Sequence, residues 1–275
     1  MERVSGPGYR LRFGPDAAGL ERLEASLVGT AFAPHRHDTY AIGITLRGVQ
    51  TFRYRGERRQ CLPGEWHVLH PDEVHDGAAG TDEGFGYRIV YLDPSLVREA
   101  LEGRPLPFVA DPVVRPGGMP ASLTACLADI DRPLEETERL EFTVLFADAL
   151  ERHSGAAGVR PVRRPPLALG ALSRVRELIV ADPAVRHSLA EFEAVSGLDR
   201  WTIARQFRAA YGTSPTRFRT MRQLDRARRL LAGGTPPGDA AQAAGFADQS
   251  HLTRMFKSAY GLTPARWTAA LVAGR

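Results

Sequence analysis

Three histidines in the first half of the chain have the chemistry to hold a metal ion or a polar ligand. His35 and His37 are one residue apart, and His75 ends the string Pro-Asp-Glu-Val-His. Three imidazoles could bind iron, zinc or manganese. The alternative is that the three histidines line or rim a polar pocket without a metal, and Asp38 is the only carboxylate in the segment 38–43. We therefore expect a small-molecule site and no cofactor.

A strand-like segment downstream adds a fourth candidate to this site. Along Gly84–Leu92, alternation puts Tyr87 and Ile89 on one face and Arg88 on the other. An interior face with aromatic and a few polar groups is a usual small-molecule site. We expect Tyr87 to bind the ligand together with the histidines, and plain core packing of Tyr87 is the alternative.

A second kind of chemistry comes from an internal repeat. Asp199–Pro215 and Asp248–Pro264 align without a gap, and seven of seventeen positions are identical. Each copy has an Asp that can cap a helix, an apolar pair four residues apart, and a Tyr-Gly that precedes a proline-started helix. With a short helix before each copy, this pattern predicts two helix-turn-helix units.

The helix faces opposite the apolar pairs carry side chains that suit DNA. These are Arg200, Trp201 and Arg205 in the first copy, and Gln249, Ser250, Thr253 and Arg254 in the second. Such donors read base edges and grip phosphates in the major groove. We predict that these residues contact double-stranded promoter DNA. A merely solvated face is the alternative, and the occurrence of the same chemistry in both copies argues against it.

The segment between the copies has the length of a spacer. Pro215–Leu231 reads as one helix of 17 residues, which would span about 25 Å. Successive major-groove segments on one face of DNA lie about 34 Å apart. A rigid spacer of this length could therefore place both recognition helices in adjacent grooves from one chain. Arg226 and Arg229 on this spacer are expected to touch phosphate if they touch DNA at all.

Charge is divided unequally along the 275 residues. Residues 171–275 carry 16 basic and 8 acidic side chains, whereas residues 1–170 carry 20 and 24. A basic half beside a slightly acidic half suggests a polyanion-binding module joined to another domain. The ordinary content of hydrophobic (43%) and charged (25%) residues excludes a disordered chain, a collagen and a coiled-coil rod.

Targeting signals are not found in the sequence. No apolar run approaches the roughly 18 residues of a membrane helix, and the first ten residues have no apolar core of a signal peptide. Two cysteines cannot make a disulfide framework. The expectation is a soluble cytoplasmic protein with no membrane partner.

The elements that must position these residues fall into two domains. Short runs rich in aromatic and branched residues predict strands at Thr39–Leu46, Gln50–Arg55, Trp66–His70 and Gly84–Leu92. Helical patterns follow at Pro94–Ala100, Pro120–Ile130 and Pro133–His153, and after a Gly- and Pro-rich linker at 154–166 only helices are predicted. The expected fold class is α+β: a β-barrel with helices in residues 1–153, and an all-α domain with two helix-turn-helix motifs in residues 167–275.

The helical half resembles a known family. Residues from about Leu172 to Leu271 resemble the DNA-binding domain of the AraC/XylS family of bacterial transcription regulators, and Ala244–Trp267 is similar to that family's C-terminal signature almost position by position. The resemblance implies base contacts by Trp201 and Arg205, and by Gln249, Ser250, Thr253 and Arg254. The first unit departs from the pattern, since Ala204 stands where some relatives have a long polar base reader.

The β-rich half resembles a cupin barrel of the kind fused to many AraC-type regulators. The strings Leu46-Arg-Gly48, Cys61-Leu-Pro-Gly64 and Pro71-Asp-Glu-Val-His75 carry this likeness over about residues 8–92. It implies an effector-binding domain followed by dimerisation helices, and the family as a whole implies RNA polymerase as a partner. Arabinose is not implied, because Tyr87 and Ile89 stand where arabinose-sensing relatives have a His and a Trp.

The leading hypothesis is a transcription regulator, not an enzyme, controlled by a small molecule in the barrel. One rival is a cupin-type metal oxygenase or isomerase with an accessory DNA-binding domain, although such enzymes usually add a Glu after His-x-His. Another is a DNA-repair methyl acceptor, which needs an activated thiolate, and the surroundings of Cys61 and Cys126 do not suggest one. The apolar stripe in Leu134–Leu150 predicts a homodimer, with packing of that stripe on its own barrel as an equal alternative.

Overall fold

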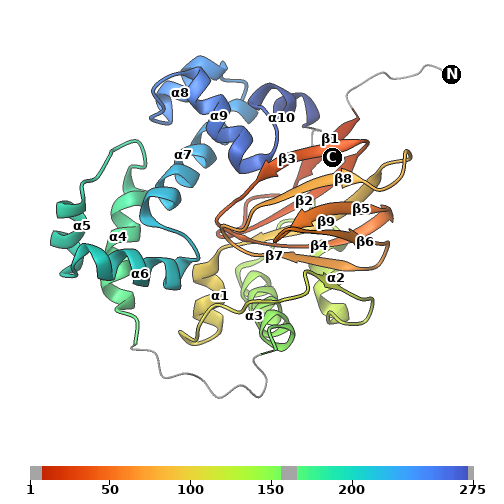
Figure 1. Cartoon of the computed structure of the whole chain (residues 1–275), viewed down its shortest axis with the longest axis horizontal. Coiled ribbons are helices and arrows are strands. Elements are labelled where there is room, and N and C mark those ends of the chain that lie inside the picture. Colours follow the sequence, from red (N-terminus) through yellow and green to blue (C-terminus); the bar gives the residue numbers. More distant parts are fainter. Residues whose placement is uncertain (1–7, 156–165, 272–275) are drawn as a thin grey trace.

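A computed structural model describes residues 8–155 and 166–271 as a β-rich domain followed by a helical one (Figure 1). We call the first the β domain; it consists of β1 (Tyr9–Phe13), β2 (Leu20–Leu27), β3 (Thr30–His35), β4 (Tyr40–Gly48), β5 (Gln50–Tyr54), β6 (Glu57–Cys61), β7 (Trp66–Leu69), β8 (His75–Ala79), β9 (Phe85–Leu92), α1 (Pro94–Ala100), β10 (Val113–Val114), α2 (Ala121–Ala128) and α3 (Glu136–His153). The helical domain consists of α4 (Leu169–Ala181), α5 (Leu189–Ser196), α6 (Arg200–Tyr211), α7 (Pro215–Ala232), α8 (Pro237–Ala243), α9 (Gln249–Tyr260) and α10 (Pro264–Ala270). The α+β fold class and the two helix-turn-helix motifs are confirmed.

The strands form two antiparallel sheets that enclose a core. One sheet has the order β1-β2-β9-β4-β7-β10 and the other β3-β8-β5-β6. Along β9, Tyr87 and Ile89 pack between the sheets with Phe52 of β5. Arg88 points to the outer face, where it donates to the Leu127 carbonyl at the end of α2 (2.8 Å). The predicted alternation along β9 is therefore confirmed.

Helices α1 to α3 cover the outer face of the six-stranded sheet, as Figure 1 shows below the strands. Phe146 and Leu150 of α3 are fully buried against this sheet. The alternative in which the apolar stripe packs on its own domain thus accounts for most of the stripe. Leu140 and Val144 lie on the opposite side of α3 and stay 49% and 44% exposed.

The two copies of the sequence repeat have the same caps in the structure. The Asp199 carboxylate accepts from the backbone N–H of Trp201 at the start of α6 (3.0 Å), and the Asp248 carboxylate accepts from that of His251 in α9 (2.6 Å). Gly212 and Gly261 end these helices with φ values of 72° and 69°, where glycine avoids the strain of a side chain. The local sequence thus determines where each recognition helix begins and ends.

The domains share part of their core. Phe52 and Tyr87 of the β domain belong to the same cluster of buried apolar side chains as Phe256 and Trp267 of the second helix-turn-helix unit. The first unit has a separate cluster, which contains Ile203 and Phe207. The domain boundaries at 153/154 and 166/167 remain predictions, since most of the predicted linker lies outside the described residues.

The structure contains strands that the sequence analysis did not predict. Two of them, β3 and β8, carry His35 and His75. The others are β1, β2, β6 and β10. The predicted spacer helix is present as α7 and is 18 residues long. Within the described residues, no helix has the length and apolar character needed to cross a membrane.

Candidate DNA interface and effector cavity

The first recognition helix, α6, presents the predicted residues to solvent. Arg200, Trp201 and Arg205 are all exposed, and Trp201 has 71% of its surface accessible. Arg200 is engaged within its own unit, because its guanidinium pairs with Glu193 of α5 (3.2 Å). Arg205 donates to the Thr202 hydroxyl of its own helix (3.2 Å) and has no carboxylate partner among the described residues. Trp201 and Arg205 are therefore better placed than Arg200 to meet a ligand outside the unit.

The second recognition helix, α9, has a more open polar face. Gln249, Ser250 and Arg254 are exposed and Thr253 is half-buried. Within the described residues, none of these four side chains makes a hydrogen bond or an ion pair. An Arg, a Gln and two hydroxyls left free on one face form a set of donors that can contact base edges.

The spacer helix α7 is bonded to both units. The Gln223 amide donates to the carbonyls of Ala244 and Gly245 before α9 (3.1 and 2.9 Å), and the Arg219 guanidinium donates to those of Val185 and Ala184 before α5 (2.7 and 2.9 Å). Both helix-turn-helix units are thus hydrogen-bonded to the same helix, α7. Eighteen residues give α7 a length of about 27 Å.

The two arginines of α7 that were expected to touch phosphate, if they touch DNA at all, border the space between the domains, and their contact with DNA remains a prediction. Arg226 and Arg229 line a cavity between the two domains, and Arg226 is 3.6 Å from Asp182. Arg222 and Arg228 also line this cavity. The orientation of the arginine-rich side of α7 toward the β domain could not be predicted from the sequence, because it depends on how the domains dock.

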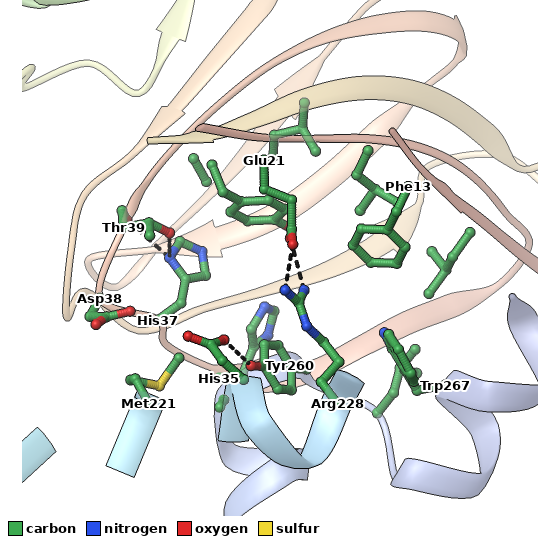
Figure 2. Close-up of a pocket in the computed structure, with 18 of the residues that line it drawn as sticks. Phe13, Glu21, His35, His37, Asp38, Thr39, Met221, Arg228, Tyr260 and Trp267 are labelled. Carbon is green, nitrogen blue, oxygen red and sulfur yellow. Dashed lines mark hydrogen bonds and ion pairs between the residues drawn. The ribbon is translucent and has the colours of Figure 1, made fainter. Parts of the chain in front are cut away.

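The cavity has a volume of about 670 Å³ and is lined by both domains. The β domain supplies residues of β1, β2, β3, β8 and β9, and the helical domain supplies residues of α7, α9 and α10. Figure 2 shows Arg228 reaching from α7 across the cavity to Glu21 of β2. The guanidinium and the carboxylate make two hydrogen bonds, one of them 2.8 Å long.

All four predicted effector residues line this one cavity. The rings of His35 and His75 have centroids 4.3 Å apart, those of His37 and His75 4.9 Å, and Tyr87 lines the same space from β9. The sequence indicated these residues correctly as neighbours of one pocket. Whether they bind a ligand remains a prediction.

The three histidines are held in the neutral form. Burial lowers the pKa of His75 to about 4. Burial, together with the neighbouring imidazoles, lowers the pKa values of His35 and His37 well below the ordinary value. Each Nδ1 lies within 3.0 Å of a backbone carbonyl, from Ala33, Thr39 and Glu73 respectively.

A second ion pair joins the domains beside the cavity. Asp38 and Arg222 are 2.9 Å apart, and Arg222 is also 3.2 Å from Asp225 of the same helix. Asp225 in turn accepts from the Tyr260 hydroxyl of α9 (3.1 Å). Burial raises the pKa of Asp38 to about 6, although the Arg222 guanidinium favours the charged form. A polar network therefore links the turn after β3 to α7 and α9.

The C-terminal end of α6 is held by the β domain. The Arg98 guanidinium of α1 is buried and donates to the carbonyls of Ala210 (2.9 Å) and Ala209 in the last turn of α6. Asp72, with a φ of 64°, pairs with Arg208 of α6 (3.0 Å). An arginine at this end offsets the negative end of the helix dipole.

The C-terminal end of α9 is held by β3. The backbone N–H groups of Ala33 and Arg36 donate to the carbonyls of Gly261 (3.1 Å) and Ser258 (3.2 Å). A Cβ at Gly261 would lie only 3.0 Å from Nδ1 of His35. A cavity-lining histidine is thus in contact with the cap of a recognition helix.

Possible metal ligands and the two cysteines among residues 8–155 and 166–271 bear on the two enzyme alternatives. These residues contain no group of three or more His, Cys, Asp or Glu side chains placed to hold a metal ion. Both cysteines are buried, and burial raises the thiol pKa of Cys61 to about 11 and that of Cys126 to about 12. A nucleophilic thiolate needs a lowered pKa, so neither cysteine is activated.

Comparison with known proteins agrees with the two parts of the molecule. Residues 17–145 match the family model of the AraC-like ligand binding domain, and residues 194–270 match that of a helix-turn-helix domain. An uncharacterised HTH-type transcriptional regulator, YbfI of Bacillus subtilis, is 25% identical over 80% of this chain and 81% of its own length.

Solved structures show the same two-domain fold. ToxT from Vibrio cholerae superimposes with a TM-score of 0.64 at 13% identity, over 93% of this chain and all of that one. A structure of ToxT with a bound unsaturated fatty acid gives a TM-score of 0.61 at 13% identity, over the whole of both chains. The class of protein is thus a regulator with an N-terminal ligand-binding domain and a C-terminal helix-turn-helix domain. The chain belongs to the AraC family of transcriptional regulators.

Proposed function

We propose that this protein binds specific promoter sequences and that a small molecule in the cavity between its domains controls this binding. The observation that carries the proposal is that the cavity is lined from one side by the β domain and from the other by α7, α9 and α10. A ligand in the cavity would therefore touch the spacer and the second recognition helix directly. Cytoplasmic location is part of this proposal.

The DNA side rests on the exposed faces of α6 and α9. We propose that Trp201 and Arg205 act from the first helix and that Gln249, Ser250, Thr253 and Arg254 act from the second. Arg200 is a weaker candidate for base contact, because its pair with Glu193 must break or be shared. Bonds from α7 to both units support the reading of one site by two helices of a single chain.

The effector side rests on the size and lining of the cavity. Its volume of about 670 Å³ lies within the usual range for small-molecule sites, about 300–1,000 Å³. We propose His35, His37, His75 and Tyr87 as effector-binding residues. The structure of ToxT with an unsaturated fatty acid supports an organic effector for this fold, and it does not carry the identity of that ligand over to this chain.

Control of DNA binding would pass through three contacts between the domains. They are the pair of Glu21 with Arg228, the backbone bonds from β3 to α9, and the bonds of Arg98 to the end of α6. Because each contact ends on α6, α7 or α9, a ligand that moves β2 or β3 changes how the recognition helices are held. Activation and repression are both compatible with this arrangement.

Dimerisation and contact with RNA polymerase also belong to the proposal. The buried position of Phe146 means that Glu at this site would unfold α3 rather than test a dimer. We propose instead that Leu140 and Val144, on the exposed side of α3, meet a second copy of the chain. Light scattering of Leu140→Glu/Val144→Glu should show a lower mass than the wild type. A wild type that stays monomeric at all concentrations would end this part of the proposal.

The test of the proposed function uses the purified full-length chain. Genomic footprinting should recover a specific DNA site, bound at least about a thousandfold more tightly than unrelated DNA. A ligand screen by thermal shift, followed by titration of that DNA site, should find a compound that changes DNA affinity. Tyr87→Phe should weaken the response to this compound and leave ligand-free DNA binding unchanged. Binding that is equal on all sequences would overturn the proposal.

A further inference from the structure

The inner wall of the cavity carries three imidazoles in the same chemical state. His35, His37 and His75 each place Nδ1 at 2.8 to 3.0 Å from a backbone carbonyl oxygen. A carbonyl oxygen can only accept, so each Nδ1 must carry the proton and donate it. In a neutral imidazole the other nitrogen, Nε2, is then left as an acceptor with a free lone pair.

These Nε2 lone pairs have no donor within the protein. In the described part of the chain, none of the three Nε2 atoms makes a hydrogen bond. The three Nε2 atoms are not enclosed by the protein either. The fully buried nitrogens without a hydrogen-bond partner are on other side chains, such as His67. All three residues line the cavity. Their acceptors are therefore available to whatever occupies it.

Protonation does not remove this acceptor character at neutral pH. Burial lowers the pKa of all three rings, and in His75 to about 4. The guanidinium of Arg217 also lowers the pKa of His37, and α7 contributes Arg222, Arg226, Arg228 and Arg229 to the lining of the cavity. Arg228 is already bound to Glu21 by two hydrogen bonds. Arg222 and Arg226 are likewise paired, with Asp38 and Asp182. At the three rings, an incoming ligand therefore meets neutral hydrogen-bond acceptors.

We propose that His35, His37 and His75 form an acceptor wall, which binds the end of the effector that carries hydrogen-bond donors and no negative charge. Hydroxyl and ammonium groups share this chemistry. A carboxylate or phosphate would bring further lone pairs against those of Nε2 and would leave the acceptors unsatisfied. This deepens the proposed function, since it rests on the cavity being the effector site.

The position of His35 gives the acceptor wall a route to DNA binding. The ring of His35 lies close to Gly261, which caps α9. On the same strand, the backbone N–H of Ala33 donates to the Gly261 carbonyl. A ligand donor that binds Nε2 of His35 can displace the imidazole ring, and Nδ1 of this ring lies next to the Gly261 cap. The donor-bearing end of the ligand is therefore the end that is sensed.

The test reads the histidine rings themselves. Full-length protein labelled with ¹⁵N-histidine is examined by long-range ¹H–¹⁵N correlation spectra at pH 7, and His37→Phe and His75→Phe assign the signals while keeping a ring in place. All three rings should show a protonated Nδ1 and a bare Nε2. His153 is the control for the opposite tautomer, because its Nε2 lies 2.8 Å from the Gly118 carbonyl outside the cavity.

Three probes with the same six-carbon ring then test the ligand class: cyclohexanol, cyclohexylammonium and cyclohexanecarboxylate. Cyclohexanol or cyclohexylammonium should shift the three Nε2 signals and leave the His153 signal unchanged. The probe that produces the larger shift shows whether the site prefers a hydroxyl or an ammonium group. The better of these probes should bind at least about tenfold more tightly than the carboxylate, a difference of about 1.4 kcal/mol.

Several results would overturn the acceptor wall. They are a proton on Nε2 of any of the three rings, an equal response to the carboxylate, or no response to either donor probe. Shifts produced by zinc sulfate alone, with both donor probes silent, would indicate a metal site instead. A specific DNA footprint from the same protein is a separate readout, so the wall can fail while the proposed function stands.

Discussion

The ion pair between Glu21 and Arg228 is expected to hold the β domain on the spacer helix. The pair makes two hydrogen bonds, and the side chains are only 31% and 18% exposed. The perturbation is a double-mutant cycle in the full-length chain: Glu21→Gln, Arg228→Met, and both together. Such a cycle isolates the pairwise energy from the packing that Arg228 makes on Phe13 and Tyr260.

The magnitude follows from the geometry. A hydrogen bond between charged groups contributes about 1.5–3 kcal/mol when it is protected from water. Partial exposure reduces this value, because solvent screens the charges and fully exposed pairs contribute little. For two bonds in this half-buried setting we expect a coupling of about 2 kcal/mol. Glu21→Gln alone should cost at least as much, since Arg228 then loses its carboxylate.

Urea denaturation of the four proteins measures this coupling. The matched control is the cycle at Arg132 and Glu138, which also form two hydrogen bonds, both 2.9 Å long, but on the surface at 47% and 33% exposure. The control should give a clearly smaller coupling. If the coupling of Glu21 with Arg228 is no larger than the control, the pair does not fasten the domains and our reading of the interface is wrong.

Three other predictions follow from the same structure. Arg98→Met should lower the free energy of unfolding by about 2 kcal/mol through loss of the charged bonds to the end of α6, and Arg98→Lys should lose less. The contribution of His70 and His75 to stability should be full above pH 6.5 and fall between pH 6.5 and 4, because burial lowers their pKa values to about 4 and the unfolded chain takes up protons first. Asp38, whose pKa is raised to about 6, should offset part of this loss below pH 6. Each of the two histidine rings should lower the free energy of unfolding by about 2 kcal/mol at pH 5, as measured by thermal or urea unfolding. A free energy of unfolding that does not change with pH would contradict the neutral state of the histidines. Residues 167–275 alone should bind DNA in filter or gel-shift assays with an affinity that falls steeply with salt, and no binding at low salt would mean that the helical domain needs the β domain.

The helical domain could be predicted in detail because its signals are local. Each recognition helix is bounded by an Asp cap and a glycine that lie within the repeated segment itself. The apolar pairs Ile203/Phe207 and Leu252/Phe256 are four residues apart, so the buried face of each helix follows from helical periodicity. The opposite faces are exposed as expected.

The β domain was only half predictable. The strands around Tyr40–Tyr54 and Phe85–Leu92 are rich in aromatic and branched residues, whereas β6 reads Glu-Arg-Arg-Gln-Cys and β3 contains Pro34. Such edge strands carry charges and proline, which mask the usual pattern. The clustering of His35 with His75 could be expected only from the family resemblance, since it depends on the pairing of β3 with β8.

Contacts between the domains could not be read from the sequence at all. Glu21, Asp72 and Arg98 look like ordinary surface charges until the helical domain docks on them. The same docking places arginines of α7, including Arg226 and Arg229, at the cavity, and phosphate contact by these two residues remains a prediction.

Recognition of a specific DNA site by this protein depends most directly on base reading by α9. The decisive measurement compares Arg254→Ala with Arg229→Ala, an arginine of the cavity, on DNA sites that differ at single base pairs. We expect Arg254→Ala to cost about 1–3 kcal/mol on the correct site and to relax the preference at one position, while Arg229→Ala keeps the base preference of the wild type. Equal losses for Arg254→Ala on every site, or none on any, would contradict the assignment of α9 as a reader of sequence.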